Sequence, residues 1–324
     1  MRRCNETEKQ IADMRAHYLA LLRYCDENLG RVLDAMDAHD MWRDTMLIVN
    51  TDHGFLLGEH DWWGKNDMPD FNEIAHTPLF LYDPVSGIRG ERRDALTQTI
   101  DLAPTLLDFF GKPIPPDMRG RSLLPVIRES APGHAYALFG YFNGPINITD
   151  GQYVYMRARV DDAVQMHQYT MMPTAMDSRL PVERLQKAEF APPFAFTKGC
   201  PTFRIPVPAQ NTKLPRGGHR LYNLAVDPKQ VQPVEEKETE ARLLRAMGRL
   251  LAENDAPEAI YAAYGIPKPE KKRADQSGGG KHPLPFFVSG QRKEKKRESW
   301  KFLKCSSLQW RRIFHMMKTP YHRK

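Results

Sequence analysis

A loop directly after an apolar strand gathers the side chains in this sequence that are best suited to chemistry. The stretch TDHGFLLGEHDWWGKND, residues 51–67, follows the apolar run MLIVN and contains three aspartates, two histidines, three glycines and one lysine. Asp52 and His53 stand at the carboxyl end of that strand, where ligands bind in open α/β sheets. A carboxylate suits a hard cation such as Ca²⁺ or Mg²⁺, and an imidazole suits a softer cation or an anionic oxygen. The pair is therefore a candidate metal site.

The rest of the loop and the segment after it supply candidates for holding an anion. Lys65 follows a glycine, so its ammonium group can approach a bound anion with little crowding. His60 and His76 are candidate donors to the same anion. Gly54 is expected to permit a sharp turn after the Asp-His pair. Together these residues predict a pocket for a tetrahedral oxyanion, built from a metal and a lysine.

Each of these residues also has a purely structural explanation. Asp and Gly favour turns, so the D-H-G segment alone is as readily a simple turn as a site. Lys65 alone would be a solvated surface charge, and His76 has an equal claim to be a structural histidine. Trp62 and Trp63 are expected to pack rather than to form a platform for substrate. The metal-and-anion interpretation depends on these residues acting as a set.

Helices and apolar strands must position this loop. Apolar residues recur at three- and four-residue steps over residues 8–39, which predicts an amphipathic helix. The apolar strand TMLIVN follows it, and a second apolar strand is TPLFLYDP, residues 77–84. Continuous apolar strands after a helix are typical of an α/β fold with a buried, parallel sheet. Residues 97–111 predict another helix, and KPIPPDMRGRSLLPVI predicts a loop that leads into a short helix.

The pattern changes after about residue 133. The segments AYALFGYFNG, QYVYMRARV and HRLYNLAVDP predict separate strands of an antiparallel sheet in a smaller subdomain. Residues 161–217 are rich in proline and have no clear period, which predicts long ordered loops. An amphipathic helix is expected over residues 234–254.

Three regions follow from these patterns. Residues 1–132 are expected to be part of a catalytic α/β domain, and residues 133–265 a C-terminal subdomain with antiparallel strands and a helix. Residues 266–324 are expected to be a basic, disordered tail. We find no internal repeats.

The charge of the chain is concentrated in that tail. The whole chain has a formal net charge of +7, with 47 Lys/Arg and 40 Asp/Glu. Residues 268–324 hold 17 Lys/Arg and 4 Asp/Glu, or +13, which leaves 30 basic and 36 acidic residues elsewhere, or −6. The folded part is therefore not expected to bind nucleic acid. An alternative for the tail is a basic amphipathic helix that binds an acidic surface.

Several classes of protein are excluded by composition and patterning. The sequence has no run of 18 or more apolar residues, so no transmembrane segment is expected. The N-terminus has no apolar stretch of the kind that a secretory signal needs. The four cysteines are far apart and form no C-x-x-C pair, so a structural zinc site is not expected. These observations favour a reduced, cytoplasmic location. They leave the oligomeric state open.

The ordered blocks VNTDHGFLLGEHDWWGKN, NEIAHTPLFLYDP, TIDLAPTLLDFFG and MRGRSLLPVI resemble the sulfatase family of the alkaline-phosphatase-like superfamily, including its arylsulfatase and iduronate-sulfatase members. The late segment LYNLAVDPKQ is similar to the family's C-terminal strand. The resemblance covers residues 8–265 and is most specific over residues 47–124. It implies the second half of an alkaline-phosphatase-like α/β sheet flanked by helices, followed by a small α+β subdomain with an antiparallel sheet.

The resemblance also implies a function and a site. Sulfatases are metal-dependent sulfuric ester hydrolases, so a small sulfated substrate and a divalent cation are expected, with Ca²⁺ favoured over Mg²⁺ or Mn²⁺. Asp52 and His53 match the residues that hold this cation. Lys65 matches the lysine that contacts the sulfate. His76 matches a histidine near the active site of some relatives, and His60 matches by position.

The family's nucleophile is missing from this sequence. It is a cysteine or serine in Cys/Ser-x-Pro-x-Arg that is oxidised to formylglycine, and it precedes the D-H-G segment in the family. The nearest stretch here, CPTFR at residues 200–204, has its proline one place early and follows the D-H-G segment. We therefore expect the C-terminal portion of a sulfatase, inactive alone, with an unpaired sheet edge and exposed apolar faces. Two alternatives are a phosphate or phosphonate ester hydrolase of the same superfamily and a non-catalytic remnant that binds an anion or a partner.

Overall fold

The computed structural model describes residues 4–65, 68–172, 174, 179–207 and 218–270. The chain forms two compact units, which we describe separately. One unit comprises Met1–Arg15 and Trp42–Pro269, and the other comprises Ala16–Met41 and Glu270–Lys324. The expected boundaries after residues 132 and 265 remain predictions. The expected disorder of the tail concerns residues that, from 271 on, lie outside the described ranges.

Helix α1, Glu8–Ala38, confirms the long helix expected from the apolar period. Met36 is its buried residue, whereas Met14, Leu21 and Val32 on the same apolar stripe are exposed. No helix in the described part of the chain is both long enough and apolar enough to cross a membrane.

The two apolar strands pair with each other, but the expectation of a parallel sheet is wrong. After the short 3-10 helix η1, Met41–Arg43, strand β1, Leu47–Asn50, pairs antiparallel with β4, Leu79–Tyr82. Asn50 lies opposite Leu79, so the chain leaves β1 and enters β4 at the same end of the pair. Within the described residues between the two strands, no crossover helix carries the chain to the other end. The loop of interest is therefore held at one sheet end by both of its termini.

A small hairpin occupies the first part of that loop. Strand β2, Leu56–Leu57, pairs antiparallel with β3, Trp63–Gly64, and the 3-10 turn η2, Glu59–Asp61, joins them. The single-turn helix α2, Asn72–Ala75, follows and leads into β4. Gly58 and Gly64 have φ angles of +96° and +104°, which glycine adopts more readily than other residues.

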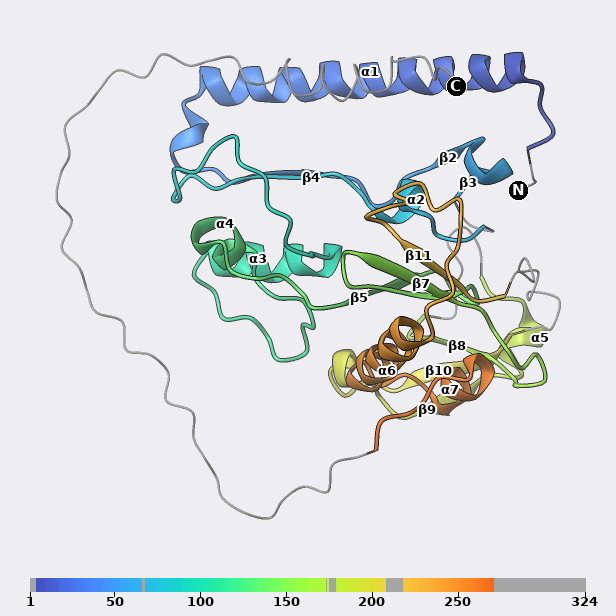
Figure 1. Cartoon of the computed structure of the whole chain (residues 1–324). Helices are drawn as coiled ribbons and strands as arrows, with labels where there is room; N and C mark the ends of the chain where they lie inside the picture. Colours follow the sequence, from blue (N-terminus) through green and yellow to red (C-terminus); the bar gives the residue numbers. More distant parts are fainter. Residues whose placement is uncertain (1–3, 66–67, 173, 175–178, 208–217, 271–324) are drawn as a thin grey trace. The chain divides into compact units, whose positions relative to one another are not determined.

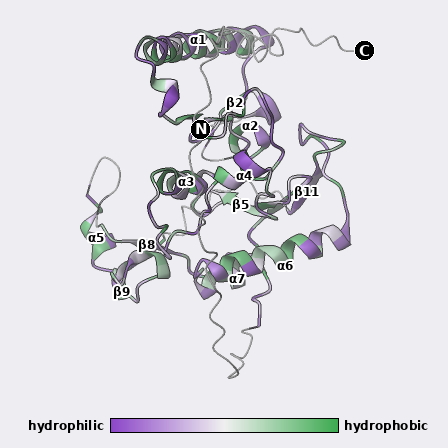
Figure 2. Cartoon of the chain, turned by 90° about the vertical axis from the view of Figure 1, so that its left-hand side faces the viewer, coloured by the Kyte–Doolittle hydropathy of each residue, from purple (hydrophilic) through white to green (hydrophobic). Residues whose placement is uncertain are grey.

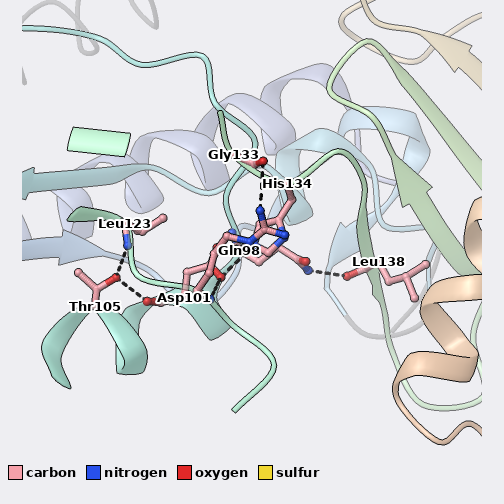
Figure 3. Close-up of polar contacts among 8 residues, drawn as sticks. Gln98, Asp101, Thr105, Leu123, Gly133, His134 and Leu138 are labelled. Carbon is pink, nitrogen blue, oxygen red and sulfur yellow. Dashed lines mark hydrogen bonds and ion pairs between the residues drawn. The ribbon is translucent and has the colours of Figure 1, made fainter. Parts of the chain in front are cut away.

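A buried carboxylate joins the segments that follow β4. The 3-10 turn η3, Thr99–Asp101, continues into α3, Leu102–Phe109, and α4, Leu124–Glu129, lies later in the chain. Figure 3 shows Asp101 accepting hydrogen bonds from the backbone N–H of Gln98, at 2.8 Å, and from His134 Nε2, at 2.9 Å from each carboxylate oxygen. The backbone N–H of Arg121 donates to the same carboxylate at 2.9 Å. One fully buried side chain thus links three segments that are distant in sequence.

The antiparallel sheet expected for the C-terminal region is confirmed. Its order is β11-β7-β6-β5, and each neighbouring pair is antiparallel. The strands are β5, Ala137–Gly140; β6, Ile146–Thr149; β7, Tyr153–Arg157; and β11, Arg220–Asn223. Strand β6 was not expected as a separate strand, because its residues INIT follow a turn within six residues of β5.

Helices cover one face of this sheet. Helix α6, Lys237–Glu253, is the expected amphipathic helix, and α7, Glu258–Tyr264, follows it (Figure 1). Figure 2 shows hydrophobic and hydrophilic residues alternating along α6. Its buried Leu243 and Met247 belong to one cluster with Tyr155 of β7 and Leu221 of β11. This apolar packing holds the subdomain together.

The opposite face of the same sheet packs against the loop that carries the candidate site. Val154 and Met156 of β7 and Tyr222 of β11 form a second buried cluster with Leu56 of the β2–β3 hairpin and Phe71 before α2. Side chains alternate between the two faces along a strand, so Tyr155 contacts the first cluster whereas Val154 and Met156 contact the second. The C-terminal sheet therefore serves as the support on which the loop is positioned.

The region 161–217, for which long ordered loops were expected, also contains strands and short helices in its described residues. It contains strands β8, His167–Thr170; β9, Glu189–Ala191; and β10, Thr202–Pro206, together with α5, Val182–Leu185, and η4, Ala195–Thr197. The strands form an antiparallel sheet in the order β8-β10-β9. They are three to five residues long and pair across ten or more residues of chain, so a local sequence period does not reveal them.

Candidate functional site

The β2–β3 hairpin returns Lys65 to the end of β1. Lys65 Nζ contacts Nε2 of His53, and Oδ2 of Asp52 lies 3.2 Å from the same nitrogen. Three of the residues predicted from the sequence thus meet at one imidazole nitrogen. They come from two places in the chain, the turn after β1 and the residue after β3.

The orientation of the His53 ring follows from its neighbours. Its Nδ1 lies 2.8 Å from the carbonyl oxygen of Gly54, which can only accept a hydrogen bond. Nδ1 therefore donates its proton to this carbonyl, and Nε2 is the ring nitrogen that faces Lys65 and Asp52. A ring whose other nitrogen donates to a backbone carbonyl is the usual arrangement of a metal-binding histidine. His53 is thus oriented to bind a cation or an ammonium group through Nε2.

Asp52 supplies an accessible negative charge beside that nitrogen. Its side chain is 80% exposed, and its Oδ1 accepts a hydrogen bond of 3.0 Å from the backbone N–H of His53. Partial desolvation acts to raise the pKa of Asp52, but the charge of His53, backbone N–H groups and Lys65 together lower it below its usual value. The carboxylate is therefore ionised at neutral pH and available to a ligand.

The donor set fits part of a divalent cation site. A carboxylate oxygen and an unprotonated imidazole nitrogen 3.2 Å apart can bind one ion together. Calcium takes about six to eight oxygen ligands, and no group of three or more His, Cys, Asp or Glu side chains gathers anywhere in the described ranges. Asp52 and His53 therefore account for two ligands, and a complete site needs further donors.

Close packing, rather than turn geometry, explains the glycine of the D-H-G segment. Gly54 is absent from the residues with positive φ. A Cβ atom on Gly54 would lie 1.7 Å from the carbonyl oxygen of Glu73, and the Gly54 N–H donates to the carbonyl of Ile74 at 2.8 Å. The backbone after His53 is thus pressed directly against α2. This contact fixes the carbonyl that sets the His53 tautomer.

Side chains from the N-terminal segment hold the hairpin in place. Arg15 Nε donates to the carbonyl of Leu57 at 2.8 Å, and its guanidinium pairs with Glu59 at 3.1 Å. Trp63 Nε1 donates to Glu6 Oε2 at 2.7 Å, and Trp62 packs against the buried cluster that includes Phe71. These contacts support the expectation that both tryptophans are packing residues. They also fix the strand that ends next to Lys65.

His60 lies in a different environment from Lys65. It has a left-handed φ of +53°, and its ring stacks on Phe71 with 3.6 Å between ring centroids. Its Nε2 is 3.5 Å from Oε2 of Glu73, which is too long for a strong hydrogen bond, and both atoms are buried. The structure therefore does not bring His60 together with the Asp52–His53–Lys65 group. Its proposed contact with an anion stays a prediction.

His76 is the remaining residue predicted for the site. It ends α2, where its backbone N–H donates to the carbonyl of Asn72 at 2.9 Å, and it is exposed. Within the described ranges, its side chain makes no hydrogen bond or ion pair with Asp52, His53 or Lys65. A catalytic role for His76 also stays a prediction.

A buried acidic residue that was not predicted from the sequence lies in the same loop, just before α2. Asp70 is 6% exposed, and its Oδ2 accepts a weak hydrogen bond of 3.4 Å from Asn147 Nδ2 on β6. Burial raises the pKa of Asp70 from 3.8 to about 6. The segment MPDF reads as an ordinary turn, and nothing in the sequence distinguishes its aspartate from an exposed one.

The segment CPTFR leads into and forms part of strand β10. Cys200 is exposed, and Arg204 pairs with Glu189 of the neighbouring strand at 2.5 Å. Its arginine is thus engaged within the C-terminal region. This placement agrees with the rejection of CPTFR as a nucleophile segment.

Comparison with known sequences finds similarity in the N-terminal third of the chain. Residues 2–112 match the Sulfatase family model. N-acetylglucosamine-6-O-sulfatase of Bacteroides thetaiotaomicron is 37% identical over 112 residues, which cover 35% of this chain and 20% of that protein. Arylsulfatase K of Canis lupus familiaris is 35% identical over 124 residues, 38% of this chain and 22% of that protein. The chain thus spans about a fifth of the length of these curated relatives.

Comparison with solved structures extends over more of the chain. A Bacteroides fragilis protein described as a sulfatase has a TM-score of 0.54 and 17% identity, covering 80% of this chain and 48% of that one. A protein solved with its substrate D-glucosamine-2-N,6-O-disulfate has a TM-score of 0.50 and 19% identity, with coverages of 75% and 41%. Phosphonate monoester hydrolase from Silicibacter pomeroyi also reaches 0.50, with 23% identity and coverages of 76% and 42%. These likenesses show the alkaline-phosphatase-like α/β fold expected from the sequence.

Proposed function

Taking residues 2–112 as a sulfatase-family segment, we propose that Asp52 and His53 bind a divalent cation and that Lys65 contacts the sulfate of a small sulfated substrate. The observation that carries this proposal is the meeting of the three side chains at Nε2 of His53. The relatives named for sulfatase activity support the reaction class, the hydrolysis of a sulfuric ester. The sulfated sugar bound to a structural neighbour supports the substrate class.

The three residues have distinct tasks in this proposal. His53 offers a lone pair whose direction is fixed by the Gly54 carbonyl, and Asp52 adds the negative charge. A divalent cation, with Ca²⁺ favoured over Mg²⁺ or Mn²⁺, would neutralise charge on the sulfate oxygens. Lys65 and a cation cannot share the Nε2 lone pair, so Lys65 must turn away when a cation binds. Its ammonium group then becomes available to the sulfate.

The chain alone lacks a nucleophile for this reaction. Its sequence contains no Cys/Ser-x-Pro-x-Arg, and Arg204 of the nearest similar segment is paired with Glu189. We expect that the residues of this chain bind and orient the sulfate group without breaking the ester. Formylglycine, which the family uses, would have to come from residues outside this sequence.

Activity measurements test whether this chain binds the sulfate while other residues supply the nucleophile. The purified chain with 4-nitrophenyl sulfate and Ca²⁺ should release no 4-nitrophenol above the buffer blank. Joined to a segment that carries Cys/Ser-x-Pro-x-Arg, it should release the product, and Lys65→Met should reduce that release at least tenfold. Lys112→Met, at an exposed lysine elsewhere in the chain, is the matched control and should change nothing. Stoichiometric, metal-dependent turnover by the chain alone would contradict the proposal.

Hydrolysis of a phosphonate or phosphate ester is a second candidate function. The observation that favours it is the phosphonate monoester hydrolase among the structural neighbours. Sulfate and phosphonate esters share a tetrahedral anion, and the Asp52–His53–Lys65 group does not separate them. Parallel assays of the joined protein with an aryl sulfate and an aryl phosphonate decide the matter. A higher kcat/KM for the phosphonate would replace the sulfatase proposal with this one.

A further inference from the structure

One face of the small sheet β8-β10-β9 combines aromatic and charged side chains. Arg204 of β10 lies directly opposite Tyr169 of β8 and Glu189 of β9. Residues directly opposite each other in an antiparallel pair project from the same face. Phe190, next to Glu189 in β9, projects from the other face, where the centroid of its ring lies 5.0 Å from that of Phe203. The two faces of this sheet are thus chemically different.

Two phenylalanines of the loop before β10 extend the first face. The ring of Phe194 meets Tyr169 edge-on, with 5.1 Å between centroids. The ring of Phe196 lies 5.3 Å from that of Phe194, and the two planes differ by 4°. Phe196 is 48% exposed although it belongs to an aromatic cluster. We call Tyr169, Phe194 and Phe196 the aromatic platform.

The loop that carries the platform is held at three points. Thr197 is buried, and its Oγ1 lies 3.0 Å and 2.8 Å from the carbonyl oxygens of Phe194 and Cys200. The backbone N–H of Ala195 donates to Asp255 at 2.8 Å. Lys198 pairs with Asp117 at 3.3 Å. A surface loop fixed in this way loses little entropy when a ligand binds to it.

Hydrogen-bonding groups of both kinds stand beside the aromatic platform. Arg204 and Glu189 pair at 2.5 Å, and their side chains remain 42% and 65% exposed. The guanidinium offers further N–H donors, and the carboxylate offers a second acceptor oxygen. Burial and the charge of Arg204 lower the pKa of the neighbouring His167, so its ring is neutral at pH 7. Arg204, Glu189 and His167 together therefore offer hydrogen-bond donors and acceptors but carry no net charge.

We propose that the aromatic platform binds a pyranose ring of a glycan. The C–H face of a sugar ring packs on the exposed face of an aromatic ring, here that of Phe196, and its hydroxyls need both donors and acceptors nearby. An apolar ligand would form no hydrogen bonds with Arg204 and Glu189. An anionic ligand would be repelled by Glu189. The proposal rests on the proposed function only in its choice of sugar, because N-acetylglucosamine is named for one relative.

The test is an NMR titration of the full chain with methyl N-acetylglucosaminide, which carries no sulfate. Resonances of the platform rings should shift to saturation. Phe196→Ala should weaken binding roughly twofold to tenfold, as expected for one aromatic contact. Phe190→Ala is the matched control, because Phe190 is 76% exposed on the other face of the same sheet. It should leave the affinity unchanged.

The outcomes separate this inference from the proposed function. Lys65→Met should leave binding of the unsulfated sugar intact, because Lys65 is assigned to the sulfate. The absence of saturable shifts, or an equal loss in Phe196→Ala and Phe190→Ala, would overturn the inference without affecting the sulfatase proposal. Self-association in sedimentation that Phe196→Ala abolishes, without sugar binding, would show instead that the face contacts a second copy of the chain.

Discussion

The Asp70→Asn variant tests how burial of one carboxyl makes stability depend on pH. Asp70 is 6% exposed, and burial raises its pKa from 3.8 to about 6. The folded state therefore binds the proton more tightly than the unfolded state does. The stabilising contribution of this proton is complete below pH 3.8 and is lost as the pH rises through about 6.

The size of the effect follows from the pKa difference. The rise from 3.8 to about 6 corresponds to about 3 kcal/mol, at roughly 1.4 kcal/mol for each pKa unit. Asparagine has nearly the same shape, remains neutral and keeps an oxygen that can accept the hydrogen bond from Asn147. The free energy of unfolding of the variant should therefore exceed that of the parent chain by up to about 3 kcal/mol above pH 7. Below pH 4 the two should be similar.

Urea unfolding at pH 4, 5.5 and 7.5 measures this difference. The variant's advantage should be small at pH 4, larger at pH 5.5 and complete at pH 7.5. Asp94→Asn, at an exposed carboxylate, is the control and should show no such trend. A variant that is less stable at pH 7.5, or an advantage that does not change with pH, would refute the assignment of Asp70 as a buried acid.

Two further predictions concern packing and buried polar contacts. Gly54→Ala should lower the free energy of unfolding by about 1–3 kcal/mol or more, because its Cβ would overlap the Glu73 carbonyl. Gly30→Ala in α1 is the control, because a Cβ there would have no atom within 4 Å, and it should raise the free energy of unfolding by about 0.5–1 kcal/mol. Equal shifts of the urea midpoint in the two variants would contradict the packing argument. Asp101→Ala should cost about 3–5 kcal/mol, because it leaves His134 and two backbone N–H groups without their buried acceptor. A calorimetric melting temperature within 2 °C of the parent value would contradict that role for Asp101.

Much of the fold could be predicted because its elements have local signals. Helix α1 has a long apolar period, and β1, β4, β7 and β11 are compact runs of apolar and aromatic residues. The direction of pairing between β1 and β4 was predicted wrongly. It depends on which end of β1 the chain comes back to, and long-range contacts decide this rather than the residues of the strands themselves. The β8-β10-β9 sheet was missed for a related reason. Its short strands are stabilised by partners far away in the sequence rather than by their own composition.

The candidate site likewise combines residues that a local sequence pattern predicts with features that depend on long-range contacts. Asp52 and His53 could be predicted because they directly follow a recognisable strand, and Lys65 because of its place in the loop pattern. The contact of Gly54 with α2 could not be predicted, since it depends on how the loop folds back. The burial of Asp70 and Asp101 could not be predicted either, because the C-terminal region covers one and distant segments enclose the other.

The measurement that tests the central claim most directly is the ¹⁵N NMR shift of His53 Nε2 during a Ca²⁺ titration with and without inorganic sulfate. The account predicts a saturable shift with Ca²⁺ and tighter binding when sulfate is present. Asp52→Asn should weaken the response, and Lys65→Met should remove the effect of sulfate. The absence of a saturable shift, or the same Ca²⁺ response in Asp52→Asn as in the parent chain, would contradict the claim that these three residues form a metal and sulfate site.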